Sequence, residues 1–234
     1  MIRPAAFRRI LTATIAALFA IATMTAPLTP ARAAAPRLSF SAAIARLVVK
    51  AEHIGGYQRS LFGGWIDADG DGFSTRAEVL MSESKVAVTW NTRHTILTGS
   101  WYSLYDATTW TKASDVDIDH VVPLAEAWRS GAWSWSSARR KSYANDLGAG
   151  WTLRAVTDNV NQSKGDGDPS DWMPPYAPAT CRYLADWVSV KIRWKLSINT
   201  LRSDRASSLH GAASDAIVQR RHSRLRCASH RKHG

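Results

Sequence analysis

The chain has 234 residues and a formal net charge of +11, with 30 Lys and Arg against 19 Asp and Glu. This length is enough for one domain with a sizeable hydrophobic core, or for one domain with extensions. After residue 33 no segment is apolar for long enough to span a bilayer, which argues against an integral membrane protein. Only Cys181 and Cys227 are present, and neither has further ligands at metal-binding spacing, which argues against a cysteine zinc site.

The first 33 residues have the pattern of a secretory signal peptide. Arginines at positions 3, 8 and 9 precede an apolar run, and Ala31-Arg32-Ala33 then has the small-x-small pattern of a signal-peptidase site. We expect residues 1–33 to be removed on export, leaving a soluble, extracellular protein that has no membrane contact. An uncleaved membrane anchor is the alternative, because the apolar run is near the lower length limit of a spanning helix.

The positive charge of the exported chain is concentrated at its C-terminal end. Residues 201–234 carry eight Arg and Lys against two Asp, whereas the rest of the exported chain is nearly neutral. A basic tail of this kind suits polyanions such as nucleic acid or an anionic cell surface, and a solvated terminus is the alternative. In an exported protein, Cys181 and Cys227 most simply form one disulfide, which would tie this tail to a helix beginning near Cys181.

Hydrophobic periodicity predicts the elements of the domain in chain order. A helix over 40–54 ends at two glycines, and a Gly- and Asp-rich loop then leads into a second helix. Further strands are expected at 85–90, 94–106, 116–122 and 151–156, and further helices at 123–133, 134–147, 157–166, 179–196 and 203–223. These elements predict a helix-rich α+β domain over 34–200 with a small β element in its middle, followed by a basic C-terminal helix or tail at 201–234.

The stretch DVDIDHVVPLAEAW, residues 115–128, contains the first candidate site. A carboxylate at the end of a strand, such as Asp119, can hold a divalent cation, and the adjacent His120 can take a proton from water. Hydrolysis of a phosphodiester needs both functions, since the metal stabilises the charge on the phosphate and a base activates the attacking water. The unperturbed pKa of histidine leaves much of it neutral near pH 7. The alternative is structural, an Asp that orients a His in a turn.

The second candidate half-site lies about forty residues further on, in LRAVTDNVNQSKGDGDP. Asn161 falls on a predicted helix just after a short strand, and Lys164 follows three residues later on the same face. A strand, loop, strand and helix can bring Asp119, His120 and Asn161 to one point. There Asn161 would supply an oxygen ligand and Lys164 would meet a phosphate. Alone, Asn161 is equally typical of a surface amide or a helix cap.

DVDIDHVVPL together with AVTDNVNQSKGD resembles the D-x-D-H-x-x-P and N-x-x-K signatures of the HNH, or ββα-metal, endonucleases. More narrowly, the segment from Gly64 to Leu196 is similar to the exported actinobacterial-type HNH family of the DUF1524 group. The resemblance implies a ββα-metal core at about 113–168. It also implies Asp119 and Asn161 as metal ligands and His120 as general base. Asp117 would orient the motif, and Lys164 would support the helix or the phosphate.

The chain departs from that family pattern in two ways. Many relatives carry a cysteine pair around GDGF and the following strand, whereas this chain has Phe73 and no Cys there, so a disulfide of the family is missing. The central Asn usual in HNH motifs is Thr152 here, whose hydroxyl can replace only part of the hydrogen bonding. This substitution bears on the rigidity of the loop between the two halves, and it favours a decayed, non-catalytic site as the alternative. Asn145 and Asp146 match the family, and we interpret both as scaffold residues.

A second possible metal site lies in DADGDGFSTRAE. Asp67, Asp69, Asp71 and Glu78, with Gly72, match the D-x-D-x-D-G-x5-E calcium-loop pattern. The Gly-broken segment before it does not look like the entering helix of an EF-hand, however. Structural salt bridging, or a direct part in the nuclease site, are therefore the alternatives for these acidic residues.

Basic and aromatic residues around the two motifs are candidates for contact with a substrate. Arg76 and Arg140 are possible phosphate-binding residues, and Arg140 belongs to a basic run on a predicted helix whose alternative role is a solvated face. Tryptophans 128, 133, 135 and 151 flank the motif region. Core packing is the ordinary explanation for such tryptophans, and stacking on the bases of a single strand is the alternative.

We therefore predict a secreted, monomeric protein that acts as a metal-dependent endonuclease of low sequence specificity on DNA, with RNA or a small phosphodiester as alternative substrates. The metal would be Mg²⁺ or Mn²⁺, held by two protein ligands and several waters. The rival from another class is a non-catalytic, calcium-stabilised binding protein that uses its basic tail on polyanions.

Overall fold

The computed structural model describes residues 39–199 together with the short stretches 219–221 and 224–226. Helices and small antiparallel sheets are mixed in this part of the chain, which confirms the predicted α+β class. The helices are α1 (Phe40–Ile44), α2 (Thr75–Glu83), α3 (Leu124–Arg129), α4 (Ser137–Ala144), α5 (Asp158–Lys164) and α6 (Thr180–Trp194), with short 3-10 turns η1 (Arg59–Phe62), η2 (Ala113–Asp115), η3 (Ala132–Ser134) and η4 (Ala177–Ala179). The strands are β1 (Thr89–Trp90), β2 (Ile96–Tyr102), β3 (Thr109–Lys112), β4 (Val116–His120), β5 (Leu153–Thr157), β6 (Gln219–Arg221) and β7 (Arg224–Arg226).

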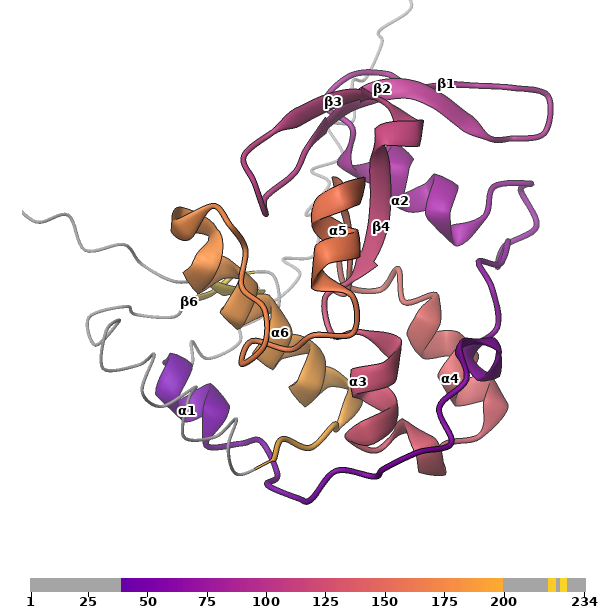
Figure 1. Ribbon diagram of the computed structural model, residues 1–234. Helices are drawn as coiled ribbons and strands as arrows, with labels where there is room; N and C mark the ends of the chain where they lie inside the picture. Colours follow the sequence, from indigo (N-terminus) through magenta and orange to yellow (C-terminus); the bar gives the residue numbers. More distant parts are fainter. Residues whose placement is uncertain (1–38, 200–218, 222–223, 227–234) are drawn as a thin grey trace, which may run out of the picture. The chain divides into compact units, whose positions relative to one another are not determined.

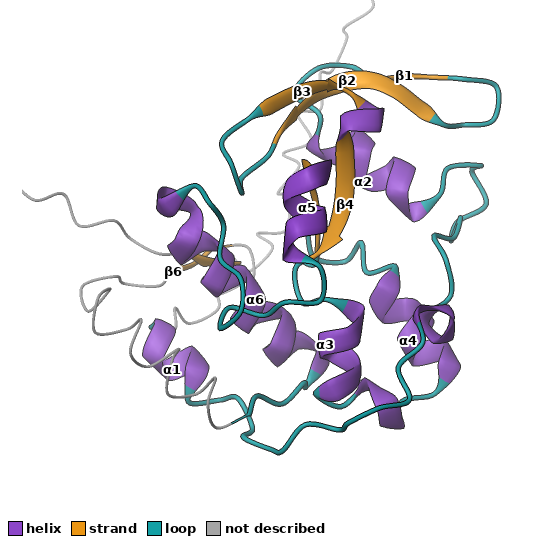
Figure 2. Ribbon diagram, in the orientation of Figure 1, coloured by secondary structure: helices purple, strands orange, loops and turns teal. Residues whose placement is uncertain are grey.

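The strands form three separate antiparallel sheets in the described residues, β1-β2-β3, β4-β5 and β6-β7. β4 and β5 pair along their whole length, from Val116 opposite Thr157 to His120 opposite Leu153. Helix α5 follows directly, since Asp158 is its first residue. Figure 1 shows α5 alongside β4, and Figure 2 shows the same unit of two strands and a helix by secondary structure. This unit carries the candidate site.

Two hydrophobic clusters hold the unit in place. The larger cluster includes the buried rings of Tyr143 on α4 and Tyr183 on α6, and the smaller one includes Trp101 of β2. Neighbouring residues of β5 belong to different clusters, since Ala155 is part of the smaller cluster and Val156 is part of the larger one. Neighbouring side chains of a strand point to opposite faces. The β4-β5 ladder therefore lies between the two clusters, where displacement would expose apolar side chains on either face.

Most predicted elements are present, but the first helix is much shorter than expected. Periodicity predicted a helix over 40–54, whereas α1 ends at Ile44. The amide of Lys50 instead donates to the carbonyl of Ile198, and the amide of Ile198 donates to Val48. The β-branched residues Val48 and Val49 favour this extended pairing over a helix. Strand β3 was not predicted as a separate element.

Part of the predicted C-terminal helix is also wrong. Residues 219–221 form β6 and pair with β7, with Arg221 opposite Arg224, so the predicted helix does not extend over them. Weak apolar periodicity in this segment did not reveal the pairing of the two strands. The signal peptide predicted at 1–33 and the remainder of the basic tail lie outside the described residues. No helix among the described residues is both long and apolar enough to cross a membrane.

Candidate nuclease site

Strand β4 and helix α5 meet through two matched pairs of polar side chains. Asn161 donates from Nδ2 to Asp117 Oδ2 at 3.1 Å, and Lys164 donates from Nζ to Asp119 Oδ1 at 2.7 Å. Residues two apart on a strand share a face, and residues three apart on a helix share a face. The spacing of the two Asp in DVDID and of Asn and Lys in NQSK therefore lets one helix face meet one strand face.

Asp119 is buried and accepts several hydrogen bonds. Lys164 Nζ reaches its second oxygen, Oδ2, at 2.9 Å, and the hydroxyl of Tyr105 donates to the same atom at 2.6 Å. Burial raises the pKa of Asp119 above its ordinary value, while the Lys164 ammonium and the Tyr105 hydroxyl oppose that rise. Lys164 also donates to the backbone carbonyl of His120 at 2.9 Å, and its side chain is inaccessible to solvent. The buried amine of Lys164 therefore holds the last two residues of β4, Asp119 and His120, in place.

His120 is buried, and its ring is fixed on two sides. Its Nε2 lies 2.9 Å from the carbonyl oxygen of Ala144, and the indole of Trp65 stacks on it at 5.1 Å with an interplanar angle of 4°. A carbonyl only accepts, so Nε2 carries the proton of the neutral ring and Nδ1 carries the lone pair. The pKa of His120 is lowered from 6.5 to about 4, chiefly by burial; the hydrogen bond to Ala144 opposes this change, and the positive charges of Arg59 and Lys164 add to it. The ring is thus neutral at ordinary pH.

Asp119, His120 and Asn161 line one cavity of about 200 Å³. Its other lining residues are Arg59, Ile118, Pro123, Leu124, Gln162, Gly165 and Asp166. Arg59 is exposed on the turn η1 and brings a cation to the mouth of the cavity. Sequence reasoning missed Arg59, Trp65 and Tyr105, because none of the three belongs to a motif and each reaches the site only through the fold.

Thr152 is the last residue of the long connection between β4 and β5, and it is buried. Its hydroxyl donates to Asp146 Oδ2 at 3.1 Å, and its carbonyl accepts from the amide of Val121 at 3.1 Å. Asp146 also accepts from the guanidinium of Arg193 at 2.8 and 2.9 Å and from the indole of Trp194 at 2.9 Å. The loop is therefore tied to the end of α6 through one carboxylate.

Asn145 ends α4 and holds the segment that carries Trp65. Its Oδ1 accepts from the amide of Ile66 at 3.1 Å, and its Nδ2 donates to the carbonyls of Gly64 at 3.2 Å and Lys141 at 2.9 Å. The residues on either side of Trp65 are thus bonded to this side chain. Asn145 lies outside the lining of the cavity but fixes the indole that stacks on His120.

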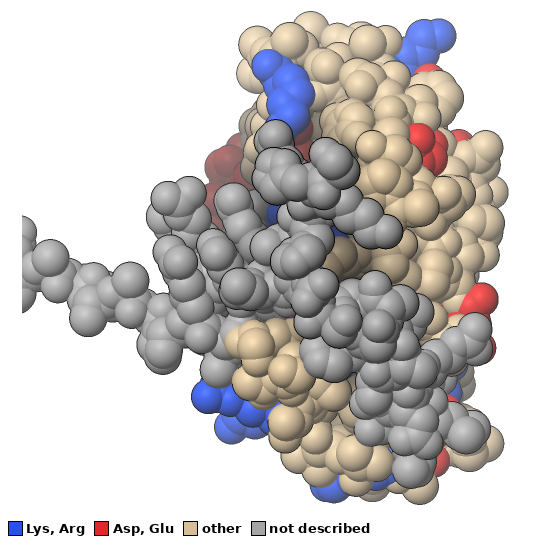
Figure 3. Space-filling view, turned by 90° about the vertical axis from the view of Figure 1, so that its left-hand side faces the viewer, with Lys and Arg blue, Asp and Glu red and all other residues tan. Residues whose placement is uncertain are grey.

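The two arginines that we predicted as phosphate ligands have backbone partners. Arg76 donates to the carbonyls of Ala113 and Val116 at 3.0 and 2.7 Å. Arg140 donates to the carbonyls of Leu61 and Trp135, and neither arginine lines the cavity. On the described part of the face shown in Figure 3, Lys and Arg lie in separate groups and do not form a continuous basic patch.

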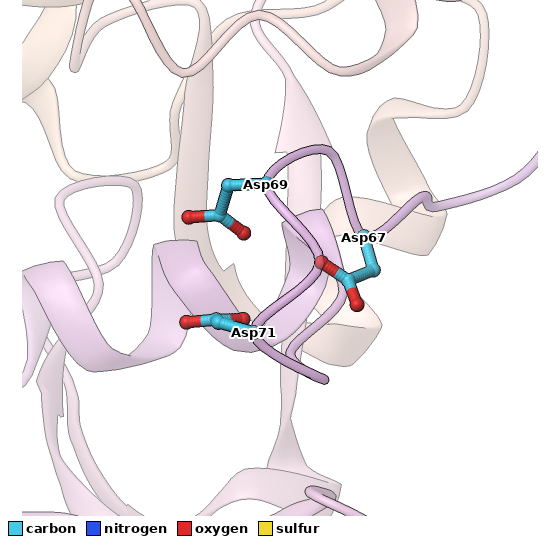
Figure 4. Close-up of side chains that lie close together, drawn as sticks. All are labelled: Asp67, Asp69 and Asp71. Carbon is cyan, nitrogen blue, oxygen red and sulfur yellow. The ribbon is translucent and has the colours of Figure 1, made fainter.

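The acidic loop before α2 brings three carboxylates together. Oxygens of Asp67, Asp69 and Asp71 lie within 4.8 Å of one another, and Figure 4 shows Asp69 and Asp71 extending to the same side of the loop. Asp67 accepts from the amides of Gly70 and Gly72 at 2.8 and 2.9 Å, and these bonds lower its pKa. Glu78, four residues into α2, is not one of this group.

Cys181 lies in the first turn of α6, as expected. Its predicted partner, Cys227, lies outside the described residues, so the pairing stays a prediction. Among the four tryptophans near the motifs, Trp128 and Trp151 are buried in the larger cluster, whereas Trp133 is about half exposed.

A polar cavity with a buried carboxylate, an amide and a neutral histidine, at the junction of two strands and a helix, is the kind of site that nucleases use for phosphodiester hydrolysis. The comparisons with known proteins agree. The chain belongs to the family described as GmrSD restriction endonucleases, C-terminal domain, whose model matches residues 77–205. That range contains Asp119, His120 and Asn161, whereas Arg59 and Trp65 precede it.

One relative extends the similarity beyond the family model. An uncharacterized secreted protein of Arthroderma benhamiae is 46% identical over 155 residues, which cover 66% of this chain and 74% of the relative. No solved structure matches the chain. The predicted relation to nucleases is therefore supported by the family match.

Proposed function

We propose that this chain is a secreted, metal-dependent endonuclease of the HNH type that hydrolyses phosphodiester bonds in DNA. The observation that carries the proposal is the single cavity lined by Asp119, His120 and Asn161. These residues come from two stretches of sequence about forty residues apart, and a structural role for each would not require them to share a polar cavity. RNA is the alternative substrate, since the same chemistry cleaves both backbones.

The donor atoms at this cavity fit a hard divalent cation. A carboxylate offers about four lone-pair positions, and three on Asp119 accept from Lys164 and Tyr105, so one remains on Oδ1. Asn161 donates from its Nδ2 to Asp117, which leaves its carbonyl oxygen for a ligand. Two oxygen ligands with retained waters suit Mg²⁺ or Mn²⁺. A cation held by Asp119 and Asn161 would stabilise negative charge on the phosphate and on the leaving oxygen.

His120 is the general base in this proposal. Its Nδ1 takes a proton from the attacking water, while its Nε2 keeps the bond to the Ala144 carbonyl. Stacking on Trp65 holds the ring plane, so the base needs little reorganisation during the reaction. A lowered pKa keeps His120 neutral and able to accept a proton over the whole neutral range. Arg59, at the mouth of the cavity, binds the phosphate that enters.

The proposed location outside the cell rests on the signal-like N-terminus and on the relative that is called a secreted protein. The acidic loop adds a second proposal about ions. Three converging Asp oxygens in a calcium-loop pattern support a calcium site that stabilises this loop in an extracellular medium.

The direct test incubates purified protein with plasmid DNA and Mg²⁺, Mn²⁺ or a chelator. Cleavage should require one of the two metals. The variants His120→Ala and Asn161→Ala should each lose at least ~100-fold in rate, on the scale of a lost base or ligand, and stay folded. Asn159→Ala, an exposed amide on the same helix, is the matched control and should cleave normally.

Two outcomes would overturn the proposal. If plasmid stays intact with both metals, the chain is not this nuclease, and the calcium-stabilised binding protein becomes the better interpretation. If His120→Ala cleaves like the unaltered protein, another group supplies the base.

A further inference from the structure

A second cavity, separate from the candidate nuclease cavity, lies between three segments of chain. It has a volume of about 430 Å³ and is lined by Val48, residues 50–53, 129–131 and 133–135, Lys195 and Ser197. We call it the Trp133 cavity. Backbone hydrogen bonds join its walls, since the amide of His53 donates to Arg129 at 2.9 Å and the amide of Ser197 donates to Ser130 at 2.9 Å. The cavity is therefore preformed, with walls that do not depend on a ligand.

The cavity presents an exposed aromatic surface. Trp133 is 48% exposed, and the imidazole of His53 stacks on it with ring centroids 4.5 Å apart and an interplanar angle of 16°. Trp135 lines the same cavity and has the Arg139 guanidinium 4.3 Å above its ring. Because the indole of Trp133 is about half exposed and rests on a parallel ring, it contributes little to the packing of the hydrophobic core. It offers a flat surface to a second flat, apolar ring.

Positive charge surrounds this aromatic surface. Lys50, Arg129 and Lys195 line the cavity, against one acidic lining residue, Glu52. Arg129 lies 3.8 Å from Glu52 and is paired with Glu126 at 3.1 Å, so Lys50 and Lys195 supply the remaining positive charge of the lining. A stacking ring among cations is the combination that binds single-stranded nucleic acid, since the ring receives a base and the cations receive the backbone phosphates.

Helix α3 connects the two cavities. Leu124 at its start lines the nuclease cavity, whereas Arg129 at its end lines the Trp133 cavity. Arg129 also donates to the carbonyl of Asp166, another residue of the nuclease cavity, at 3.1 Å. Six helical residues span roughly 9 Å. That length equals about three nucleotides at the ~3.4 Å spacing of a stacked strand.

We propose that the Trp133 cavity binds an unpaired base of the substrate strand, within a few nucleotides of the phosphate that enters the nuclease cavity. This inference rests on the proposed nuclease function and adds the class of substrate. The indole face can receive only a base that is not already stacked and paired in a duplex, so the preferred substrate is a single strand or an unpaired end.

Binding is measured first, in a chelator, so that cleavage does not interfere. The probe is a fluorescein-labelled single-stranded DNA of about 12 nucleotides, compared with the same strand carrying abasic sites. Trp133→Ala should bind the normal strand ~10-fold more weakly, the scale of one lost base stack. Trp90→Ala is the matched control, because Trp90 is 51% exposed on β1 and lies outside the cavity. It should change binding less than ~2-fold.

The abasic strand separates stacking from other effects. It should bind the unaltered protein and Trp133→Ala equally weakly, because neither complex has a base on the indole. Trp133→Phe keeps a ring and should recover part of the affinity. The proposal is overturned if Trp133→Ala binds the normal strand as tightly as the unaltered protein. It is also overturned if the variant, shown to be folded by its melting temperature, loses affinity equally for both strands.

Cleavage then distinguishes this proposal from the nuclease assignment. With Mg²⁺ or Mn²⁺, Trp133→Ala should raise KM for the single strand, while its rate on bis(p-nitrophenyl) phosphate stays unchanged because that substrate has no base to stack. Base-dependent binding without any cleavage would keep the Trp133 site and reject the nuclease function. Cleavage of normal and abasic strands with equal KM would keep the nuclease and reject the site.

Discussion

Lys164 on α5 donates to both carboxylate oxygens of Asp119 on β4, at 2.7 and 2.9 Å, and both side chains are buried. The same ammonium also holds the carbonyl of His120. One lysine thus joins the helix to the strand that presents a candidate ligand and the candidate base. Of the two roles that the sequence left open for Lys164, this geometry favours support of the helix over contact with a phosphate.

Replacement of Lys164 should therefore cost stability. Lys164→Met leaves the Asp119 carboxylate and a carbonyl buried with one partner fewer, and breaking a buried ion pair in this way typically costs about 3–5 kcal/mol. The free energy of unfolding in urea should fall by that order. Lys141→Met, on the exposed side of α4, is the control and should change it little. Unaltered stability with a higher KM for DNA would instead indicate that Lys164 binds phosphate.

The central residues of the site were predictable because the sequence patterns that indicate them are local. Strand alternation in DVDIDH and helical spacing in NQSK are both short-range, and β4, β5 and α5 lie close to their predicted positions. The two patterns suggested that Asp119, His120 and Asn161 meet at one point, and these three residues do line one cavity. Each of these patterns determines which face of its strand or helix is polar. Pairing of β4 with β5, followed directly by α5, then brings the polar faces of β4 and α5 together.

The surroundings of the site were not predictable, because they depend on long-range packing. Arg59 and Trp65 come from an irregular segment whose place is set by bonds to α4, such as those from Arg140 to Leu61 and from Ile66 to Asn145. No spacing rule relates residue 59 to residue 120. For Arg76 the sequence left two roles open, support of the core or contact with DNA, and its guanidinium donates to two backbone carbonyls.

Acid should destabilise the metal-free protein through His120. Burial lowers its pKa from 6.5 to about 4, so the unfolded chain binds more protons between these values. The stability contribution is complete above pH 6.5 and is lost as the pH falls toward 4, by on the order of 3 kcal/mol. Urea unfolding in a chelator at several pH values measures this. His120→Gln should flatten the slope, and His94→Gln should keep it; equal slopes in all three proteins would contradict the assignment.

The hydroxyl of Thr152 should matter for stability more than for catalysis. Thr152→Val keeps the shape of the side chain but removes the bond to Asp146, and a bond to a charged group contributes about 1.5–3 kcal/mol. Thr152→Ser keeps the hydroxyl and should lose less. Cleavage well below the melting temperature should fall by less than ~10-fold in Thr152→Val, because the bond from the Val121 amide to the Thr152 carbonyl remains. Complete loss of cleavage with a normal melting temperature would mean that the hydroxyl acts in the reaction.

Calcium should raise the melting temperature through the acidic loop, independently of cleavage. Sites of this type in extracellular proteins have a Kd of about 10⁻⁴–10⁻³ M, so ~10 mM Ca²⁺ should stabilise the folded chain by ~1.4–2.7 kcal/mol. Asp69→Asn removes one charge from the group of three and should reduce this shift, whereas Asp115→Asn, on the turn η2, should not. The rate of plasmid cleavage in Mg²⁺ alone should be the same in both variants. A calcium shift that survives in Asp69→Asn would move the ion away from this loop, and a shift that disappears in Asn161→Ala would place it in the nuclease cavity.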